Sequence, residues 1–164
     1  MIHTHKQQTL IENMTMWNNV IEEKLNQGLI ESIDCVYADC YQHTGPGGFT
    51  GKGTEMLKQA NQSVRSAFPD IHISNDIFGQ GDRAVNYFTI EGTHLGRWQG
   101  IEPTGRRISV RGIALVRFDK GQIVEECEYF DELTLLKQLG LLEEAEDTYS
   151  IISLLKRINP GPPA

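Results

Sequence analysis

The sequence lacks the features that mark several large classes of protein. It has no excess of basic residues, because 15 lysines and arginines stand against 22 aspartates and glutamates, and the net charge is -7. It has no apolar run of membrane length, and its first residues, MIHTHKQQT, contain no apolar signal region. We therefore expect a cytoplasmic protein that has neither nucleic acid nor a membrane as its partner.

Cysteine is scarce as well, and several chemical motifs are missing. The three cysteines, Cys35, Cys40 and Cys127, show no CxxC spacing and cannot all pair, so we expect reduced thiols. The segment 51–54, GKGT, lacks the GxxxxGK[ST] spacing of a phosphate-binding loop. No histidine, aspartate or glutamate spacing predicts a metal site, and no pattern predicts a nucleophilic triad. We expect neither a metal nor a cofactor.

The composition that remains is that of one folded domain. Hydrophobic residues make up 39% of the 164 residues and charged residues 23%, which suits a chain that buries a sizeable core. We expect a single domain over residues 1–164, with its core at about 8–140 and a C-terminal helix and tail at 141–164.

The spacing of apolar residues changes from a helical to a strand period near Pro69. Before it, apolar residues recur every three or four positions over 8–26 and 54–68, which predicts two helices. The pattern is ambiguous over 29–41, and the glycine-rich segment 43–53 is expected to be a loop. Helices followed by strands predict an α+β fold with an antiparallel sheet of four to six strands. The strands are expected at 71–77 (interrupted at 75–76), 83–93, 108–118 and 122–129, and further helices at 131–140 and 142–158.

Five short motifs, in order, carry a resemblance to a known family. They are Phe68-Pro69-Asp70, Gly92-Thr93-His94, GIEPTGRR at 100–107, GQIVE at 121–125 and DELTLLKQLG at 131–140. Over residues 17–140 the chain resembles the SnoaL-like polyketide cyclases, also called SnoaL-like ester cyclases. The resemblance implies an α+β cone of the nuclear-transport-factor-2 type, in which N-terminal helices close an apolar pocket on a curved antiparallel sheet. It also implies a homodimer that pairs through the outer sheet face, where Ile113 and Leu115 are expected.

The resemblance also implies a chemistry and a catalytic residue. The cyclases carry out a cofactor-free intramolecular aldol cyclisation, and Glu128 matches their general acid/base on the last strand. A carboxyl group walled by apolar side chains has a raised pKa and can transfer protons near neutral pH. Ala114 stands where the cyclases carry a histidine. Gly112 shares its face, so two small residues leave space beside the acid.

The remaining candidate residues each have two interpretations. Asp131 is either a second catalytic carboxylate or the N-cap of the last helix. His43, beside the glycine-rich loop, is the preferred replacement for the missing histidine, while His94 either contacts substrate or organises its loop. For Glu126 we prefer a solvated place at the pocket rim to a place beside Glu128. The expected substrate contacts are Tyr41, Tyr87, His94, Trp98, Gly112 and Ala114.

Three functions stay open at this point. The first is a cofactor-independent cyclase, or a related lyase or isomerase, that acts on a small, hydrophobic carbonyl compound. The second is a non-catalytic protein that binds a hydrophobic small molecule, because one fold can host both roles. The third is a hydrolase of the same fold, which requires two or more carboxylates in the pocket to orient a water molecule.

Overall fold

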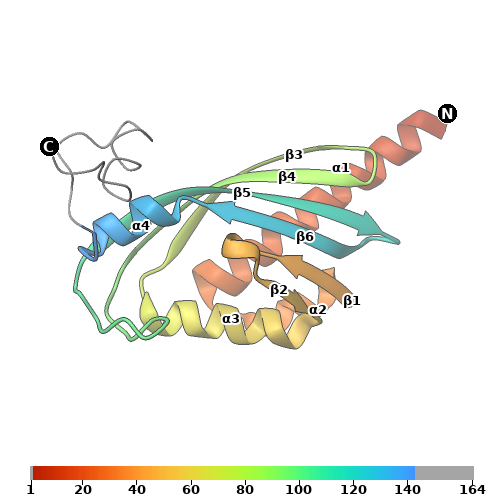
Figure 1. The fold of residues 1–164 in the computed structure, drawn as a ribbon. Helices are drawn as coiled ribbons and strands as arrows, with labels where there is room; N and C mark the ends of the chain where they lie inside the picture. The colour runs from red at the N-terminus through yellow and green to blue at the C-terminus, as the bar shows by residue number, and fades with distance from the viewer. Residues whose placement is uncertain (1, 143–164) are drawn as a thin grey trace, which may run out of the picture.

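A computed structural model describes residues 2–142, and the side chains from residue 8 onward. Over these residues the chain forms a curved, open six-stranded sheet with helices on its concave side, an α+β fold as expected (Figure 1). The helices are α1 (Ile2–Ile21), the π-helix η1 (Glu22–Gln27), the short 3-10 helices η2 (Ile30–Ser32) and η3 (Pro46–Gly48), α2 (Ile33–Val36), α3 (Thr54–Ala67) and α4 (Glu132–Gln138). The strands are β1 (Tyr37–Thr44), β2 (Thr50–Lys52), β3 (His72–Gln80), β4 (Arg83–Thr93), β5 (Arg107–Asp119) and β6 (Gln122–Phe130).

The sheet has the strand order β2-β1-β6-β5-β4-β3, and it is mixed rather than antiparallel throughout. Strands β3 to β6 form an antiparallel meander, as the sequence predicts, whereas β1 pairs with β6 in parallel. The expected α+β fold with a curved sheet is confirmed, and the sheet differs from the expected antiparallel one in this parallel pair. The reason is that no hairpin connects β1 to β6, so no short turn forces the two strands to run in opposite directions.

Several elements confirm the sequence prediction closely. Strand β4 occupies the predicted residues, α3 ends one residue before the predicted end, and β5 and β6 differ by one residue at their ends. Strand β3 continues through Asn75 and Asp76, where an interruption was expected, because both residues pair with β4. The expected helix at 142–158 lies, beyond residue 142, outside the described residues.

Two predictions near the N-terminal half are wrong in detail. Residues 43–53 were expected to be a loop, but they contain the end of β1, η3 and β2, joined by a hydrogen bond from the Gly45 amide to the Phe49 carbonyl. Gly47 and Gly48 both have positive φ, which allows this tight connection. The helix expected at 8–26 changes from α1 into the π-helix η1 at Glu22 and ends at Gly28, where φ is 82°.

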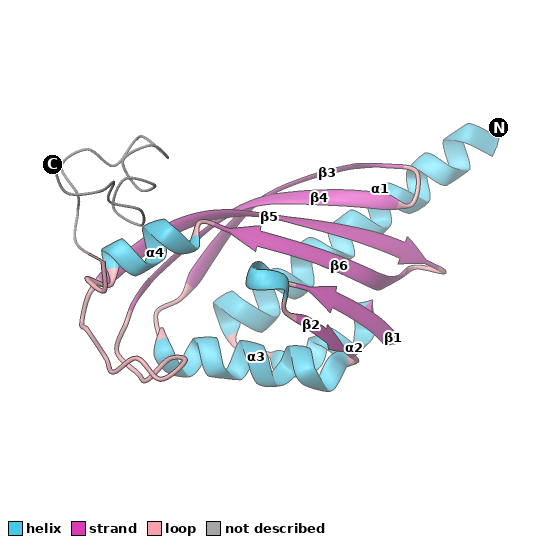
Figure 2. Cartoon of the chain, in the orientation of Figure 1, coloured by secondary structure: helices cyan, strands magenta, loops and turns pink. Residues whose placement is uncertain are grey.

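The π-helix is fixed to the rest of the fold by two side chains. The side-chain Nδ2 of Asn26 donates to the Ile73 backbone carbonyl at 3.0 Å, and the Ile73 backbone amide donates to Asn26 Oδ1 at 2.7 Å. Arg65 on α3 donates to the carbonyl of Leu25. Figure 2 shows the result: α1 and α3 lie on the same side of the sheet, and α4 lies at the end of the long strands.

The core has two parts along the concave face. The larger cluster packs α1 and β1 against the sheet around Trp17, Tyr41 and Val116, all fully buried. The smaller cluster lies where α4 meets the end of α3, around Phe68 and Leu135. Among residues 2–142, no helix is both long enough and apolar enough to span a bilayer.

The convex sheet face carries exposed apolar side chains. Ile113 and Leu115 of β5 point outward as expected, with exposures of 48% and 36%, and Tyr129 and Tyr87 lie beside Ile113 in the same cross-strand row. The homodimer expected through this face stays a prediction.

Candidate functional site

A cavity of about 390 Å³ lies between the helices and the concave face of the sheet. Most of its wall is apolar, with Trp17 and Ile21 from α1, Met56 and Val64 from α3, and Phe88 and Phe130 from the sheet. Ligand sites commonly have volumes of roughly 300–1,000 Å³ and walls of this kind, with a few polar groups that orient the ligand. The few polar groups of this cavity therefore determine which ligands it orients and which chemistry it supports.

One row of side chains crosses the cavity floor from strand to strand. Ala114 on β5 is the register partner of Asn86 on β4 and of Glu128 on β6. All three residues line the cavity. Since neighbouring strands lie about 4.8 Å apart, the Asn86 and Glu128 backbones are about 10 Å apart, with only the Ala114 methyl group between them. Ala114 thus leaves room for a ligand between an amide and a carboxyl group, as the sequence predicts for Glu128 and Ala114.

Glu128 is half-buried, and its environment favours the protonated carboxyl group. Burial away from water, with a smaller contribution from the negative charge of Glu126, raises the pKa of Glu128 to about 7. The positive charge of Lys24 acts in the opposite direction but is the weakest of the three effects. A group with this pKa gives and takes protons at neutral pH, which is the property required of a general acid/base.

Asn86 supplies the other polar end of this row. Its Nδ2 donates to Asn75 Oδ1 at 2.8 Å, while its own Oδ1 is buried and has no hydrogen-bond partner among the described residues. A buried acceptor without a partner is energetically unfavourable unless a ligand or water satisfies it. Asn86 is therefore placed to accept a hydrogen bond from a hydroxyl or amide group of a ligand.

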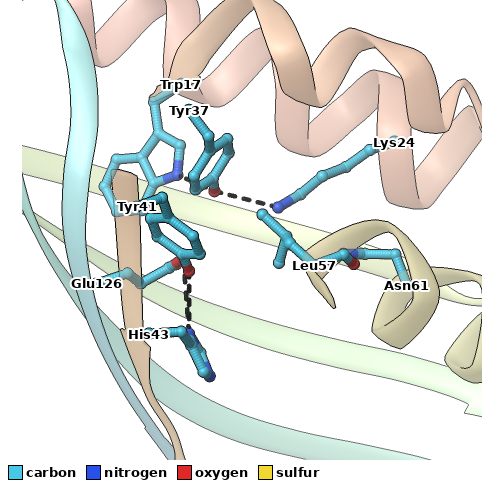
Figure 3. A network of polar contacts seen from close by, with 8 residues as sticks. All are labelled: Trp17, Lys24, Tyr37, Tyr41, His43, Leu57, Asn61 and Glu126. Carbon is cyan, nitrogen blue, oxygen red and sulfur yellow. Dashed lines mark hydrogen bonds and ion pairs between the residues drawn. The ribbon is translucent and has the colours of Figure 1, made fainter. Parts of the chain in front are cut away.

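Beside this row, Glu126 belongs to a buried hydrogen-bonded chain (Figure 3). Tyr41 donates its hydroxyl proton to Glu126 Oε2 at 2.5 Å, and the same hydroxyl oxygen lies 3.0 Å from His43 Nδ1. The Tyr41 oxygen thus accepts from the Nδ1–H of His43, so a neutral His43 keeps its Nε2 lone pair available. Burial lowers the pKa of His43, although the Glu126 carboxylate 4.0 Å away acts against this effect. The preferred place of Glu126 at a solvated rim is therefore wrong, because Glu126 is only 7% exposed.

A second polar chain lies next to the first and involves a buried lysine. Lys24 of η1 lies with Nζ 3.2 Å from the Tyr37 hydroxyl oxygen, and that oxygen also accepts from Trp17 Nε1 at 3.3 Å. The Tyr37 and Tyr41 rings meet edge to face, with their centroids 4.9 Å apart, and so connect the two chains. Lys24 is 5% exposed and lines the cavity.

The titratable groups lie in one part of an elongated cavity, and the lining also includes the polar side chains of Asn61, Ser63 and Gln99. Ile108 and Val110, earlier on β5, line it together with Leu135 of α4 and the predicted substrate contact Trp98. Ile108 and Ala114 are six positions apart, which corresponds to about 20 Å of strand. The cavity therefore suits a ligand that has a polar, hydrogen-bonding end and an apolar body.

Two predicted site residues lie outside the cavity, on the protein surface. Tyr87 was expected to contact the substrate, but it lies on the convex face with 43% exposure, because Asn86 and Phe88, its neighbours on β4, point inward instead. Asp131 is exposed and acts as the N-cap of α4, since its carboxylate accepts from the Thr134 amide at 2.9 Å and from the Thr134 hydroxyl at 2.7 Å. The N-cap interpretation of Asp131 is confirmed. Asp131 does not line the cavity, so the structure does not place it as a second catalytic carboxylate.

Three other candidates lie inside the protein but do not line the cavity. His94 packs against the Phe68 ring, and its Nδ1 accepts from the Thr104 amide at 3.3 Å, so it organises its loop. Gly112 leaves no open space, because the Phe88 ring already lies where a side chain at 112 would extend. Tyr41 is fully buried and bonds Glu126 but does not itself line the cavity.

Sequence reasoning missed two functional groups for which a signal existed. Lys24 follows Trp17 by seven positions and Ile21 by three, so it falls on the apolar stripe of the first helix, where a charged residue is unusual. Asn86 interrupts the apolar inner face of β4 between Ala84 and Phe88 in the same way. In both cases the sequence shows a polar residue where the periodic pattern calls for an apolar one. Such a residue marks a polar side chain that faces the protein interior.

The titratable groups form proton-transfer partners rather than a metal centre. Among residues 2–142, no group of three histidine, cysteine, aspartate or glutamate side chains is close enough to hold a metal ion. What the arrangement offers instead is a carboxyl group that titrates near neutrality, a neutral imidazole and a buried amine, all lining one apolar cavity.

Comparison with known proteins identifies the family. The family model for SnoaL-like polyketide cyclases matches residues 14–139, whereas no curated protein matches the chain. A solved structure assigned as a SnoaL-like polyketide cyclase from Jannaschia sp. CCS1 is 17% identical over 81% of this chain and 94% of its own, with a TM-score of 0.74. AclR from Streptomyces galilaeus, assigned as a hydroxylase, is 24% identical over 81% and 98%, with a TM-score of 0.71. IdmH from Streptomyces antibioticus, assigned as a polyketide cyclase, is 27% identical over 74% and 94%, with a TM-score of 0.65. The chain belongs to the SnoaL-like polyketide cyclase family.

Proposed function

We propose that the protein is a cofactor-independent enzyme that uses Glu128 as general acid/base on a small, largely apolar carbonyl compound. The observation that carries this proposal is the Glu128 carboxyl group, which lines an apolar cavity and has a pKa raised to about 7 by burial and by Glu126. Family membership supports a cyclase-type reaction. The reaction that we propose is an intramolecular aldol condensation, or a related lyase or isomerase step.

The proton transfers follow from the position of Glu128. Its carboxylate removes a proton from the carbon next to a substrate carbonyl, and the resulting enolate spreads its charge over the substrate's own carbonyl oxygens. The enolate carbon then attacks a second carbonyl in the same molecule, and the protonated Glu128 returns the proton to the new alkoxide. Asn86 Oδ1 supports this geometry by accepting from a substrate hydroxyl group on the other side of Ala114.

A test of this function needs only the first proton transfer. We expect the protein to accelerate deuterium exchange at the methyl carbon of acetophenone, an aromatic ketone, as followed by proton NMR. Glu128→Gln keeps the shape of the site and should lower the accelerated rate by roughly 10²–10⁴-fold. The matched control is Glu125→Gln, because Glu125 lies on the same strand but pairs with Arg117 at 2.5 Å outside the cavity. Equal exchange rates in the two variants would contradict the assignment.

A second candidate function is ligand binding without turnover. It is favoured by Ala114, because no second proton carrier stands beside Glu128 in its cross-strand row. In that case acetophenone would bind and quench tryptophan fluorescence, since Trp17 and Trp98 both line the cavity, but deuterium exchange would stay at the background rate.

A hydrolase is a third candidate, favoured by the two carboxyl groups of Glu126 and Glu128 on one face of β6. Against it, Glu126 Oε2 is already bonded to Tyr41 and is less available to orient water. Release of phenol from phenyl acetate that depends on both Glu126 and Glu128 would favour this candidate over the cyclase.

A further inference from the structure

We propose that Lys24 is a nucleophilic amine that forms a Schiff base with a ketone or aldehyde group of the compound bound in the cavity. This inference rests on the proposed function only in that it assumes a carbonyl compound in the same cavity. It adds a covalent step at a second residue, which acid/base chemistry at Glu128 does not require. Four observations carry it, and they concern the placement, the charge environment, the hydrogen bonds and the neighbours of Lys24.

The first observation is that the Lys24 amine is held in place inside the cavity wall. Lys24 is 5% exposed and lines the cavity, although lysine is rarely buried to this extent. Its backbone belongs to the π-helix η1, an element that often occurs at functional sites. Asn26 ties this helix to Ile73 of β3, and Arg65 of α3 bonds the Leu25 carbonyl. The amine therefore projects from a fixed backbone rather than from a mobile loop.

The second observation concerns ion pairs. Among the described residues, no carboxylate lies within 4.0 Å of Lys24 Nζ, unlike Lys58, whose Nζ lies 2.5 Å from Asp34. A buried ammonium group without a contacting carboxylate is costly, and such a lysine usually loses its proton instead. The environment of Lys24 agrees with this expectation. Burial lowers the pKa of Lys24, and the more distant charges of Glu126 and Glu128 act against burial without overcoming it.

The third observation is the pattern of hydrogen bonds around Tyr37, which is 1% exposed. The described partners of its hydroxyl group are Trp17 Nε1, which can only donate, and Lys24 Nζ. If Lys24 were an ammonium group, both neighbours would donate to the Tyr37 oxygen, and the hydroxyl proton would have no acceptor. If Lys24 is a neutral amine, Tyr37 donates its hydroxyl proton to the amine lone pair, and the Tyr37 oxygen accepts from Trp17. An ionised Tyr37 could accept from both neighbours and would have no proton to place. Burial argues against this state, because it raises the pKa of Tyr37 well above its usual value.

The fourth observation is that a proton donor lines the same cavity. When the amine attacks a carbonyl carbon, a C–N bond forms, and one amine proton moves to the carbonyl oxygen to give a carbinolamine. The protonated carboxyl group of Glu128 then supplies a proton to the hydroxyl group, which leaves as water while the C=N bond forms. The product is a protonated imine, and the carboxylate of Glu128 balances its positive charge. Hydrolysis consumes the same number of water molecules as were released and restores the free amine.

The protonated imine also facilitates the proposed reaction. It withdraws electrons more strongly than the parent carbonyl, so the neighbouring carbon loses its proton more readily to the Glu128 carboxylate. The resulting enamine is neutral, whereas an enolate would be an anion in an apolar cavity that contains the carboxyl groups of Glu126 and Glu128. A substrate that offers a ketone or an aldehyde is therefore favoured over one whose only carbonyls are esters.

The experiment is reductive trapping with a small ketone. The 164-residue chain is incubated at pH 7 with acetone and sodium cyanoborohydride, which reduces an imine to a stable isopropyl amine. Each of its seven lysines is followed by peptide mass spectrometry. Exposed lysines have pKa values of about 10.4 and are mostly protonated at this pH. We expect Lys24 to be labelled at least about tenfold faster than any exposed lysine, because its amine is unprotonated in a larger fraction of molecules.

Three variants make the result specific. Lys24→Arg places a guanidinium group near Tyr37 but cannot form an imine, and Lys24→Met keeps only the apolar stem. Both variants should abolish the fast label. Lys52→Met removes an exposed lysine and should leave the fast label unchanged. Labelling of Lys24 no faster than that of Lys52 in the parent protein overturns the proposal.

The same measurements separate this inference from the proposed function. Fast labelling of Lys24 together with normal exchange in Glu128→Gln would keep the Schiff base and reject Glu128 as general base. Slow labelling of Lys24 together with loss of exchange in Glu128→Gln would keep the acid/base enzyme and reject the Schiff base.

Discussion

Tyr41 Oη lies 2.5 Å from Glu126 Oε2, and this contact holds a carboxylate inside the protein beside the cavity. Tyr41 comes from β1 and Glu126 from β6, the two strands that pair in parallel. The parallel pairing places His43 directly beside Glu126, so His43 and Tyr41 approach the carboxylate from one strand. Among the strands that the structure describes, the parallel pair of β1 and β6 is therefore the pairing that assembles this chain of polar residues.

Removal of the Tyr41 hydroxyl should destabilise the fold. Tyr41→Phe leaves the buried Glu126 carboxylate without its donor, and we expect the free energy of unfolding to fall by about 1–3 kcal/mol. Tyr87→Phe is the control, since Tyr87 is exposed on the convex face, and its change should stay within about 0.5 kcal/mol. Urea denaturation at pH 7 measures both, and equal losses would show that the contact does not stabilise the protein.

Two small residues on the same face of β5 should respond in opposite ways to added volume. A methyl group at Gly112 would overlap the Phe88 ring and lie 2.7 Å from the Tyr129 carbonyl oxygen, so Gly112→Ala should cost about 1–3 kcal/mol of stability. Ala114 borders the cavity, and Ala114→Val should change stability by less than about 1 kcal/mol while it weakens the binding of acetophenone. Thermal unfolding and fluorescence titration test the pair. A larger stability loss at Ala114 than at Gly112 would contradict the cavity's position.

Glu128 should leave a signature in the pH dependence of stability. Its pKa is about 7 in the folded protein and near 4.5 in an unfolded chain, so the folded state keeps the proton over a range in which the unfolded state has lost it. The stability that this difference provides is complete below pH 4.5 and is lost as the pH rises through 7. Relative to Glu128→Gln, the parent protein should lose up to roughly 3 kcal/mol between these pH values. Parallel stability curves for the two proteins over this range would exclude the raised pKa.

The apolar convex face leads to a prediction about assembly. Ile113 and Tyr129 are 48% and 58% exposed, and a second copy of the chain would remove them from water. We expect a homodimer in sedimentation experiments at micromolar concentration, and a monomer for Ile113→Glu. Glu132→Gln, an exposed change on α4, should leave the dimer intact. A parent protein that sediments as a monomer would rule out this assembly.

Much of the fold follows from local signals in the sequence. The turn before Arg83 and the strict alternation after it define β4, and Pro69 ends the helical period just after α3. The parallel contact between β1 and β6 could not be predicted, because no local signal relates residues 37–44 to residues 122–130. The hairpin of β1 and β2 was hidden as well, since its glycines look like those of an irregular loop.

The site was predictable only in part, for a similar reason. Which face of a strand points inward depends on packing. One face of β4 carries Asn86 and Phe88, and the other carries Val85 and Tyr87. Because each face mixes polar and apolar residues, the sequence does not decide which of them is buried. Tyr87 was therefore assigned to the wrong side. Burial of Lys24 depends on the π-helical geometry of η1, which the sequence does not indicate. The place of Lys24 on the apolar stripe of the first helix was the only sign of its burial in the sequence.

The most direct test of the central claim is an NMR titration of the Glu128 carboxyl group. The side-chain carboxyl carbons of the glutamates are followed by ¹³C chemical shift from pH 3 to 9, and the Glu128 signal is assigned by its absence in Glu128→Gln. We predict a midpoint near pH 7, because burial and the charge of Glu126 both favour the protonated form. A midpoint near 4.5, the ordinary value, would show that Glu128 is a fully ionised carboxylate at neutral pH and would contradict its assignment as the proton carrier of the cavity.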